Sequence, residues 1–530
     1  MAAQTDALPR VARHRLVALA GLALSACVHS GGIDLAPAYK GEQHVVPAAW
    51  GGPSPFVEAR PSDGRLRGDW WQVFGDPVLN QLEQQAMESN PDLHAAAERF
   101  LQARDEMMKA RSKLLPQLGI GVDASLNKQS EEATFRSDNS PLRDDDLSLG
   151  GLASWEPDLW SRLRNKTRAQ IYRAEQRAAE YALARLSLQA EVASQYFALR
   201  GLDAQAAVFH ESIKIYQESL KLAEVKYRGM IVAELDVVRA KYQLSNTQAR
   251  SCRLRARRQV VEHALATLLN TAPSTFSIAP VETLEVARFE LPLSVPSVLL
   301  QRRPDVAASE RAMAQANRYI GVARSAFFPN IPLGLSGGIA GHFASLAKVS
   351  NFFWSVGGFL RVPAFTGGYR RAQLQQAWSR YRETEHHYRK SVLDAFREVE
   401  DGLSVTRLLE RELANQEAAV AAAWRQQVLS MELYRGGLAS SLDLINAQVN
   451  TLESRLTWAD RKADLLHASV SLVRALGGGW SRDDLPADGD IQPFDVLQYR
   501  ALDRPVPAGG IDVRTGSSPI THDLARTAKY

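Results

Sequence analysis

The chain repeats itself, and this internal duplication limits its fold more than any other feature of the sequence. Residues 227–241 read YRGMIVAELDVVRAK, and residues 434–448 read YRGGLASSLDLINAQ. A second pair of similar stretches lies nearer the start of each copy, at 90–118 and 303–331. The offset between the copies falls only from 213 to 207 residues, so order and spacing are kept. A unit of about 200 residues is too long for a solenoid repeat, and we predict a fold of two similar halves.

Each copy contains two stretches in which apolar residues alternate with small or polar ones. In 118–127 the apolar set is Leu118, Ile120, Val122, Ala124 and Leu126. The same alternation occurs at 147–155, 331–340 and 352–362. A period of two predicts strands with one apolar face. Stretches of about ten residues fit tilted strands that cross an outer membrane, but a half-buried strand of a soluble sheet fits the composition equally well.

Each copy also contains one exceptionally long helical stretch. From Asp158 to Arg228 there is no proline and a single glycine, Gly201, and from Tyr369 to Arg435 the single glycine is Gly402. At 1.5 Å per residue, such helices would be about 105 Å long. The stretches 233–271 and 441–476 contain neither proline nor glycine. We expect them to return antiparallel to the long helices, because a helix of this length is stable in water only when it packs sideways as a coiled coil.

The number of strands has a consequence for the oligomeric state. Two copies supply four strands, whereas the smallest membrane barrels need about eight. Unpaired strand edges are not tolerated in hydrocarbon. If these strands lie in a membrane, several chains therefore have to share one barrel, and a homotrimer would supply twelve strands together with a tunnel of long helices.

The N-terminus has the pattern of a secretory signal. Three arginines within residues 10–15 precede the apolar run LVALAGLAL, which is too short for a membrane-spanning helix. The following LSAC resembles the lipobox of bacterial lipoproteins, in which the signal is cleaved before the cysteine and the cysteine is acylated. The resemblance predicts a signal peptide at 1–26 and a lipid on Cys27, and Val28 in place of an aspartate favours the outer membrane. The alternative is an ordinary cleavage site beside an unrelated cysteine.

Five stretches together resemble one known family. They are WWQVFGDPVLNQL at 70–82, RRPDVAASE at 302–310, ARSAFFPNIPL at 323–333, VPAFTGGYRRAQ at 362–373, and the stretch at 434–448. In order and spacing they resemble the TolC-like outer membrane efflux proteins, in the lipid-anchored branch that serves RND-type pumps. The resemblance covers about residues 70–478. It implies a homotrimer with a twelve-stranded outer membrane β-barrel on a periplasmic α-helical barrel, which acts as the passive exit duct of a tripartite efflux system. Its partners would be a periplasmic membrane-fusion adaptor, an inner-membrane pump and outer membrane lipid.

The duplication and the resemblance together divide the chain. We predict a signal peptide at 1–26, a lipidated equatorial segment at 27–75, a first repeat at 76–271, a Pro-rich equatorial link at 272–298, a second repeat at 299–478, and a largely disordered tail at 479–530.

The duplicated turn can be explained by local helix chemistry alone. Gly229 and Gly436 are expected to supply the backbone angles that end the long helices. Ser440 and Asp443 match a capping box at the start of the returning helix, and a carboxylate there suits the helix dipole.

The resemblance assigns the same turn a second role, as a gate at the periplasmic mouth. It implies that Tyr434 constricts the tunnel, that Asp236 is its polar partner, and that Asp443 contributes to an acidic ring that favours cations. Two positions depart from the family's best-known pattern, since Ala439 stands where an arginine can occur and Asn446 where a second aspartate can occur. We therefore expect a single acidic ring and a weaker closure.

Other functions find little support. A net charge of +4 is too small to indicate a nucleic-acid partner, and two cysteines cannot form a cysteine-based zinc site. The stretch GLSGG at 334–338 matches a nucleophile pattern, but it falls within an alternating stretch instead of a strand-to-helix turn. We predict no enzymatic activity, no cofactor and no metal site, and the pair His386 and His387 is expected to be solvated. Five arginines at 250–258 are expected to form a solvated helix face, with contact to an adaptor or acidic polymer as the alternative.

Three alternatives to the duct of an RND-type efflux system are open at this point. The duct could serve type I secretion or metal-ion efflux, and the chain could be a periplasmic coiled-coil lipoprotein without a channel. The sequence does not identify the cargo, because the pump largely selects it.

Overall fold

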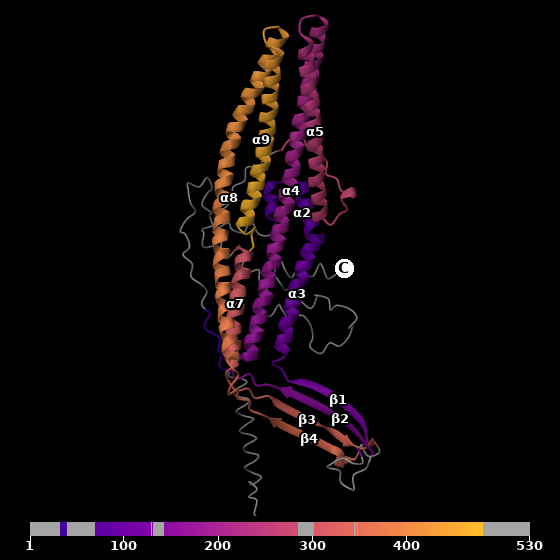
Figure 1. Cartoon of the computed structure of the whole chain (residues 1–530), viewed down its shortest axis with the longest axis vertical. Coiled ribbons are helices and arrows are strands. Elements are labelled where there is room, and N and C mark those ends of the chain that lie inside the picture. The colour runs from indigo at the N-terminus through magenta and orange to yellow at the C-terminus, as the bar shows by residue number, and fades with distance from the viewer. Residues whose placement is uncertain are drawn as a thin grey trace, which may run out of the picture.

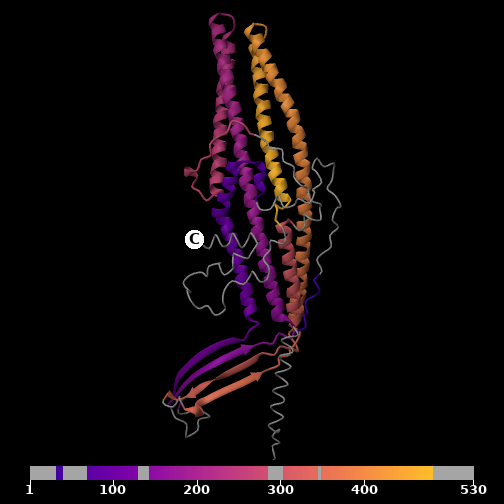
Figure 2. The same ribbon diagram turned by 180° about the vertical axis from the view of Figure 1, so that it is seen from behind.

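Two long helical hairpins stand beside each other at one end of the molecule, and a four-stranded sheet lies at the other end (Figure 1). The computed structural model describes residues 32–39, 69–128, 130, 143–284, 302–343, 346 and 348–480. The predicted signal peptide, Cys27 and residues 481–530 of the predicted tail lie outside the described residues. The view from behind shows the same two hairpins rising from the level of the sheet (Figure 2).

Both halves of the chain contain the same elements in the same order. The first half has α3 (Pro91–Ser112), β1 (Gln117–Lys128), β2 (Arg143–Trp155), α4 (Arg162–Arg228) and α5 (Glu234–Leu268). The second has α7 (Pro304–Ser325), β3 (Leu333–Gly341), β4 (Phe352–Gly358), α8 (Tyr369–Arg435) and α9 (Ser441–Ala475). Short elements are η2 (Trp70–Phe74), α2 (Pro77–Ser89), η3 (Pro273–Thr275) and η5 (Val349–Asn351). Corresponding helices have equal lengths: 22 residues in α3 and α7, 67 in α4 and α8, and 35 in α5 and α9.

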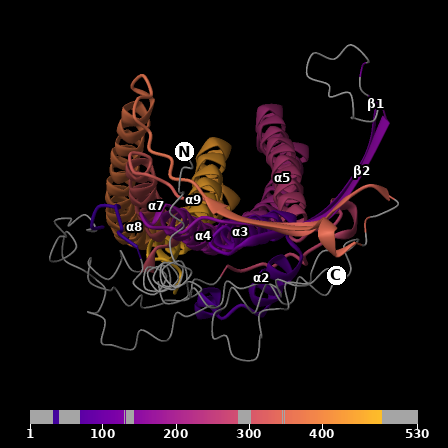
Figure 3. The same cartoon turned by 90° about the horizontal axis from the view of Figure 1, so that it is seen from below.

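The strands form one antiparallel sheet in the order β1-β2-β3-β4. The register places the predicted apolar residues of neighbouring strands opposite each other, as in the row Val122, Leu149, Ile339 and Phe352. One face of the sheet is therefore apolar, and the other carries mainly glycine, serine, aspartate and asparagine. The sheet leaves the base of the helices to one side, as the view from below shows (Figure 3). The described strands begin and end within a few residues of the predicted ones, and the last is shorter because regular pairing stops at Gly358.

The first long helix begins at Arg162, four residues after the predicted start. Asp158 stands outside the helix, and its two carboxylate oxygens accept hydrogen bonds from the backbone N–H groups of Leu163 and Arg164, each at 2.9 Å. These are two of the first N–H groups of a helix, which lack partners within the helix itself. The carboxylate therefore caps α4 from outside. Among the described helices, none combines the length and apolarity needed to span a lipid bilayer.

Helix α9 packs against both long helices, and the glycine in each of them makes room for it. A Cβ atom at Gly201 of α4 would lie 2.6 Å from the Cβ of Ala463 in α9. A Cβ at Gly402 of α8 would lie 3.0 Å from a methyl carbon of Leu472 in the same helix. Contacts this short force neighbouring atoms to move. The single glycine of each long helix thus marks a close approach of α9.

The largest apolar core lies at mid-height, where the shorter helices meet the long ones. Trp70, Phe74 and Leu79 pack there against Tyr196 and Phe197 of α4, together with residues of α5, α8 and α9. The indole N–H of Trp70 donates to the side-chain oxygen of Gln189 at 3.1 Å, so the polar atom of this buried ring has a partner.

One extended segment, residues 32–39, crosses between the two halves at the base of the helices. The carboxylate of Asp34 accepts hydrogen bonds from Asn165 and Arg168 of α4 and from Arg318 of α7, at 2.8, 2.9 and 3.2 Å. Burial alone would raise the pKa of Asp34, but the Asn165 hydrogen bond and the two arginines lower it. Gly321 lets the segment pass, since a Cβ there would lie 2.9 Å from Ala36. Asp34 therefore joins the first half to the second.

A buried carboxyl on α2 generates a prediction about stability. Glu83 is fully buried, and neither of its side-chain oxygens has a hydrogen-bond partner among the described residues. Burial raises the pKa of this carboxyl well above its usual range, so the folded state holds it neutral. Stability from the neutral group is complete below the carboxyl's ordinary pKa and is lost as the pH rises through the raised pKa of the folded state.

We therefore expect Glu83→Gln to melt a few degrees above the wild type at pH 8 and at the same temperature near pH 4. Circular dichroism in detergent measures this. Glu98→Gln, at an exposed position on α3, is the control and should leave the melting temperature unchanged at both pH values. An equal melting temperature of Glu83→Gln and wild type at pH 8 would contradict a neutral buried Glu83.

Candidate functional site

The tips of the two hairpins bring the predicted site residues together. Helices α4 and α5 meet in one tip, α8 and α9 in the other, and both tips point away from the sheet (Figures 1 and 2). A cavity lies between the hairpins, and its lining includes Asp236, Tyr434, Tyr216, Ser441 and Gln448. Residues from both copies of the duplicated turn therefore line one cavity.

Tyr434 lies in the last turn of α8 and is 3% exposed. Its hydroxyl oxygen is buried and has no hydrogen-bond partner among the described residues. Burial, followed by the nearby carboxylate of Asp236, raises the pKa of Tyr434. The two side chains line the same cavity, as a polar pair would, but no direct hydrogen bond joins them in the described chain.

Asp236 instead contacts the other hairpin through a serine. The hydroxyl of Ser441, the first residue of α9, donates to Oδ1 of Asp236 in the first turn of α5. Arg239 lies 3.8 Å from the same oxygen, one turn further along α5. The contact links α5 to α9, so it joins the two hairpins of a single chain.

Asp443, the residue equivalent to Asp236 in the second copy, bonds within its own turn. The hydroxyl of Ser440 accepts from the Asp443 N–H at 3.2 Å, and Asp443 Oδ2 accepts from the Ser440 N–H at 3.1 Å. These hydrogen bonds form the predicted capping box, which is confirmed. The hydroxyl of Ser440, which donates to Asp443 Oδ2 at 2.7 Å, and the Ser440 N–H lower the pKa of the exposed Asp443 carboxyl. Two aspartates at equivalent positions therefore make different contacts.

The prediction that Gly229 and Gly436 supply the unusual backbone angles is wrong. Their φ angles are −79° and −73°, which any residue adopts. The left-handed positions follow one residue later, at Met230 with φ 57° and Gly437 with φ 76°. At each tip the next N–H then bonds back to a helix carbonyl, as in a Schellman turn, which requires the left-handed residue just beyond the helix end.

No feature of the sequence marks Lys226, which lies at the same level on α4. Its ammonium donates to the backbone oxygen of Tyr434 and lies 4.4 Å from the centre of the tyrosine ring. The second copy has Leu433 at the equivalent place, so comparison of the two copies gives no signal. The role of Ser441 could not be predicted for a different reason, because its partner Asp236 is 205 residues away in the sequence.

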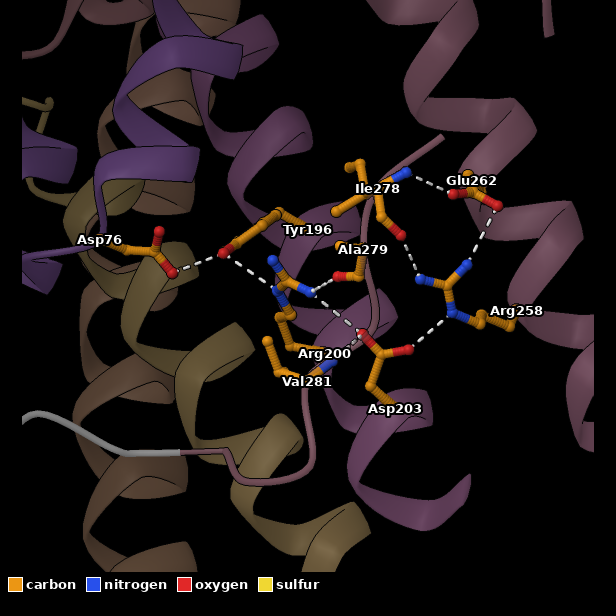
Figure 4. A network of polar contacts seen from close by, with 9 residues as sticks. All are labelled: Asp76, Tyr196, Arg200, Asp203, Arg258, Glu262, Ile278, Ala279 and Val281. Atoms are coloured by element: carbon orange, nitrogen blue, oxygen red, sulfur yellow. Dashed lines mark hydrogen bonds and ion pairs between the residues drawn. The ribbon is translucent and has the colours of Figure 1, made fainter. Parts of the chain in front are cut away.

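A second polar cluster lies at mid-height, where the link after α5 crosses α4 (Figure 4). Asp203 is at its centre, and its carboxylate accepts from Arg200 of α4 at 3.1 Å, from Arg258 of α5 at 2.6 Å and from the N–H of Val281 at 3.3 Å. Arg258 also donates to Glu262 and to the carbonyl of Ile278. These side chains hold the backbone of residues 278–281 against α4 and α5 at a level where the two helices lie side by side.

The cluster continues to α2 through a tyrosine. Arg200 donates to the hydroxyl of Tyr196 at 3.0 Å and to the carbonyl of Ala279 at 2.7 Å. Tyr196 donates in turn to Asp76, the residue that caps the start of α2. Burial and the bond to Asp76 raise the pKa of Tyr196 to about 12, so it stays a donor at neutral pH.

The five arginines at 250–258 are only in part the solvated surface that the sequence predicts. Arg253, Arg255 and Arg257 are exposed. Arg250 pairs with Glu453 of α9, and Arg258 belongs to the Asp203 cluster. Two of the five are therefore used within the chain.

The sequence signals for catalysis and metal binding have ordinary structural explanations. Ser336 of GLSGG lies inside β3, opposite Leu152 and Ser355 of the neighbouring strands. His386 and His387 are exposed on α8. One group with metal-ligand chemistry occurs among the described residues, Asp144, Asp145 and His342. Its members contact each other directly, with 3.2 Å between Nδ1 of His342 and Oδ1 of Asp144.

Comparison with known proteins decides the family. The model of the family described as outer membrane efflux protein matches residues 82–271 and again 295–478. The chain belongs to the outer membrane efflux protein family. It is accordingly an outer membrane protein, and its function is efflux.

The chain is similar to members of this family over most of its own length and most of theirs. The pyoverdine export outer membrane protein OpmQ of Pseudomonas aeruginosa is 29% identical over 473 residues, which cover 87% of this chain and 97% of OpmQ. The cation efflux system protein CusC of Escherichia coli is 28% identical, with 85% of this chain and 96% of CusC covered. The open state of the MtrE outer membrane channel of Neisseria gonorrhoeae superposes with a TM-score of 0.71 at 26% identity and covers 85% of this chain and 99% of MtrE.

We predict that Asp203→Asn frees the link at residues 278–281. The substitution removes the charge that the buried Arg200 and the half-buried Arg258 share, and breaking a buried ion pair costs about 3–5 kcal/mol. Hydrogen–deuterium exchange should show faster exchange of the amides of residues 276–284. Asp401→Asn, at an exposed ion pair on α8, is the control and should leave that exchange unchanged, because exposed pairs contribute little. Protection of 276–284 at the wild-type level in Asp203→Asn would rule out this role of the cluster.

Proposed function

We propose that the protein is the outer membrane exit duct of a tripartite efflux system, assembled as a homotrimer with a twelve-stranded β-barrel and a periplasmic α-helical barrel. The supporting observation is the sheet, which has one apolar face and two edge strands, β1 and β4, that each pair on one side only within the described chain. Edge strands are not stable in hydrocarbon unless they are paired. Three copies that pair β4 of one chain with β1 of the next would close the barrel, with the apolar face toward lipid and the polar face toward the lumen.

The partners in this proposal are a periplasmic membrane-fusion adaptor and an inner-membrane pump, most simply one of the RND type. Relatives are named as outer membrane proteins of efflux pumps, among them a toluene efflux pump of Pseudomonas putida. Their names include pyoverdine, toluene and cations as cargo. A passive duct whose lumen side carries small polar residues suits such a range, since the pump would make the selection.

The trimer is tested by native mass spectrometry in detergent. We expect a mass of three mature chains, because four strands per chain close a barrel only when copies combine. A stable monomer that retains its full strand content in circular dichroism would contradict the shared barrel.

We also propose that a lipid on Cys27 anchors the chain. The described chain begins at Gly32, which lies against the Asp158 carbonyl between β2 and α4, and the N–H of Ile33 donates to the carbonyl of Leu159 at 2.8 Å. Cys27 precedes Gly32 by five residues, a length that reaches at most about 18 Å. A lipid at Cys27 would therefore stay near the level where the strands meet the helices.

The mass of the mature N-terminal peptide checks the anchor. It should correspond to a chain that starts at Cys27 and carries acyl groups. A peptide that starts elsewhere, or that carries an unmodified Cys27, would overturn the proposal without affecting the barrel.

The hairpin tips would form the gate at the periplasmic mouth, with Tyr434 and Asp236 closing the tunnel and Asp443 contributing to an acidic ring. Tyr434 is bulky and buried beside Asp236, and Asp236 holds the start of α9 through Ser441. Asp443 is exposed, which leaves its charge free to face the tunnel. Three copies of these contacts would hold a closed state that a partner protein can open.

We expect Tyr434→Phe combined with Asp236→Ala to raise the conductance in planar bilayers. The double variant removes the tyrosine hydroxyl and a hydrogen bond to a carboxylate, which contributes roughly 1.5–3 kcal/mol per chain. Tyr242→Phe, at an exposed position on α5, is the control and should conduct as the wild type does.

Asp443→Ala separates the gate from helix capping. An acidic ring predicts a lower cation preference, whereas capping alone predicts a frayed start of α9 with unchanged selectivity. The gate proposal fails if Asp443→Ala keeps the wild-type selectivity and the double variant keeps the wild-type conductance.

A further inference from the structure

Lys226 is a buried cation that contacts the gate tyrosine of the other hairpin. It lies in the last turn of α4 and is 9% exposed. Its Nζ donates to the backbone oxygen of Tyr434, and the same Nζ lies 4.4 Å from the centre of the Tyr434 ring. One ammonium group therefore contacts both the main chain and the side chain of this residue.

The position of the contact has a physical explanation. Tyr434 is the penultimate residue of α8, and the last carbonyls of a helix lack N–H partners within the helix. They carry the negative end of the helix dipole, which a cation stabilises. A buried ammonium in turn needs acceptors, because burial without them is costly. The Tyr434 carbonyl accepts from the N–H of Gly437 at 3.2 Å and also from Lys226, and the aromatic ring adds a cation–π interaction.

The contact belongs to a set that joins the two hairpins near their tips. Asp236 accepts from Ser441 between α5 and α9. Further from the tip, Gln448 of α9 donates to Ser219 at 2.6 Å and accepts from Tyr216 at 3.0 Å, both on α4. Of these contacts, that of Lys226 involves Tyr434 directly, and the others join neighbouring residues.

We propose that Lys226 is a positioning residue of the gate, which holds the end of α8 and the ring of Tyr434 against the first hairpin in the closed state. The inference rests on the proposed gate and adds a residue that acts within one chain. Opening then requires the end of α8 to move away from Lys226, so its charge sets how much of the time the tunnel is closed.

Single-channel recording of Lys226→Met tests the inference. Methionine keeps much of the length and apolar stem but removes the charge and the donor. The fraction of time spent open should rise at least tenfold, because each of the three chains loses one charge-assisted hydrogen bond. Lys226→Arg keeps charge and donors and should remain close to the wild type. Lys221→Met removes the same charge from an exposed position on the same helix and should have no effect.

Two further measurements separate positioning from general stability. The melting temperatures of Lys226→Met and Lys221→Met should differ little, while their open fractions differ. The cation preference of Lys226→Met should equal that of the wild type, because Asp443 is untouched.

The outcomes distinguish this inference from the gate proposal on which it rests. If the Tyr434→Phe, Asp236→Ala variant opens and Lys226→Met conducts as the wild type, the role of Lys226 is refuted and the gate stands. If neither variant opens, both are refuted. Should Lys226→Met fail to assemble, Lys226→Gln against Lys226→Arg decides the matter, since the inference requires a larger open fraction for glutamine and equal fractions overturn it.

Discussion

The architecture depends on lateral packing of helices that could not exist alone. A helix of 67 residues is about 100 Å long and presents most of its backbone and side chains to water unless neighbours cover it. Helix α9 covers both long helices on the side of the tips, and α7 packs against both nearer the sheet. Gly201 and Gly402 allow α9 to approach each long helix closely. This packing sets where the tips and the mid-height core lie. Helix α9 begins at a tip, and its last residues belong to the mid-height core.

Equivalent sequences in the two halves have acquired different contacts. Asp443 caps its own helix, while Asp236 bonds to Ser441 across the hairpins. The Asp203 cluster uses backbone groups of residues 278–281, which belong to the link after the first half. The two halves of the duplicated chain are therefore held in different ways. The link fixes one hairpin at mid-height, and contacts such as that of Lys226 hold the other near its tip.

The sequence predicted those features that depend on local periodicity. The alternation of apolar residues gave the strands and their common apolar face, and the absence of proline and glycine gave the long helices. The capping box at Ser440 was also predictable, since its partners are three residues apart. The left-handed residue at each tip was misplaced by one position, because glycine frequency points to Gly229 where the turn geometry uses Met230. Lys226, Ser441 and Arg258 were not predictable as contacts, because their partners are distant in sequence or belong to another element.

The segment at 32–39 has a consequence for the order in which the protein is made. Asp34 binds Asn165 and Arg168 of α4 together with Arg318 of α7, and Arg324 donates to the carbonyl of Leu35. These contacts can all form only after residue 324 has been synthesised, almost 300 residues after Asp34 itself. The segment therefore emerges early and docks late. Its docking therefore requires that both halves of the chain have come together.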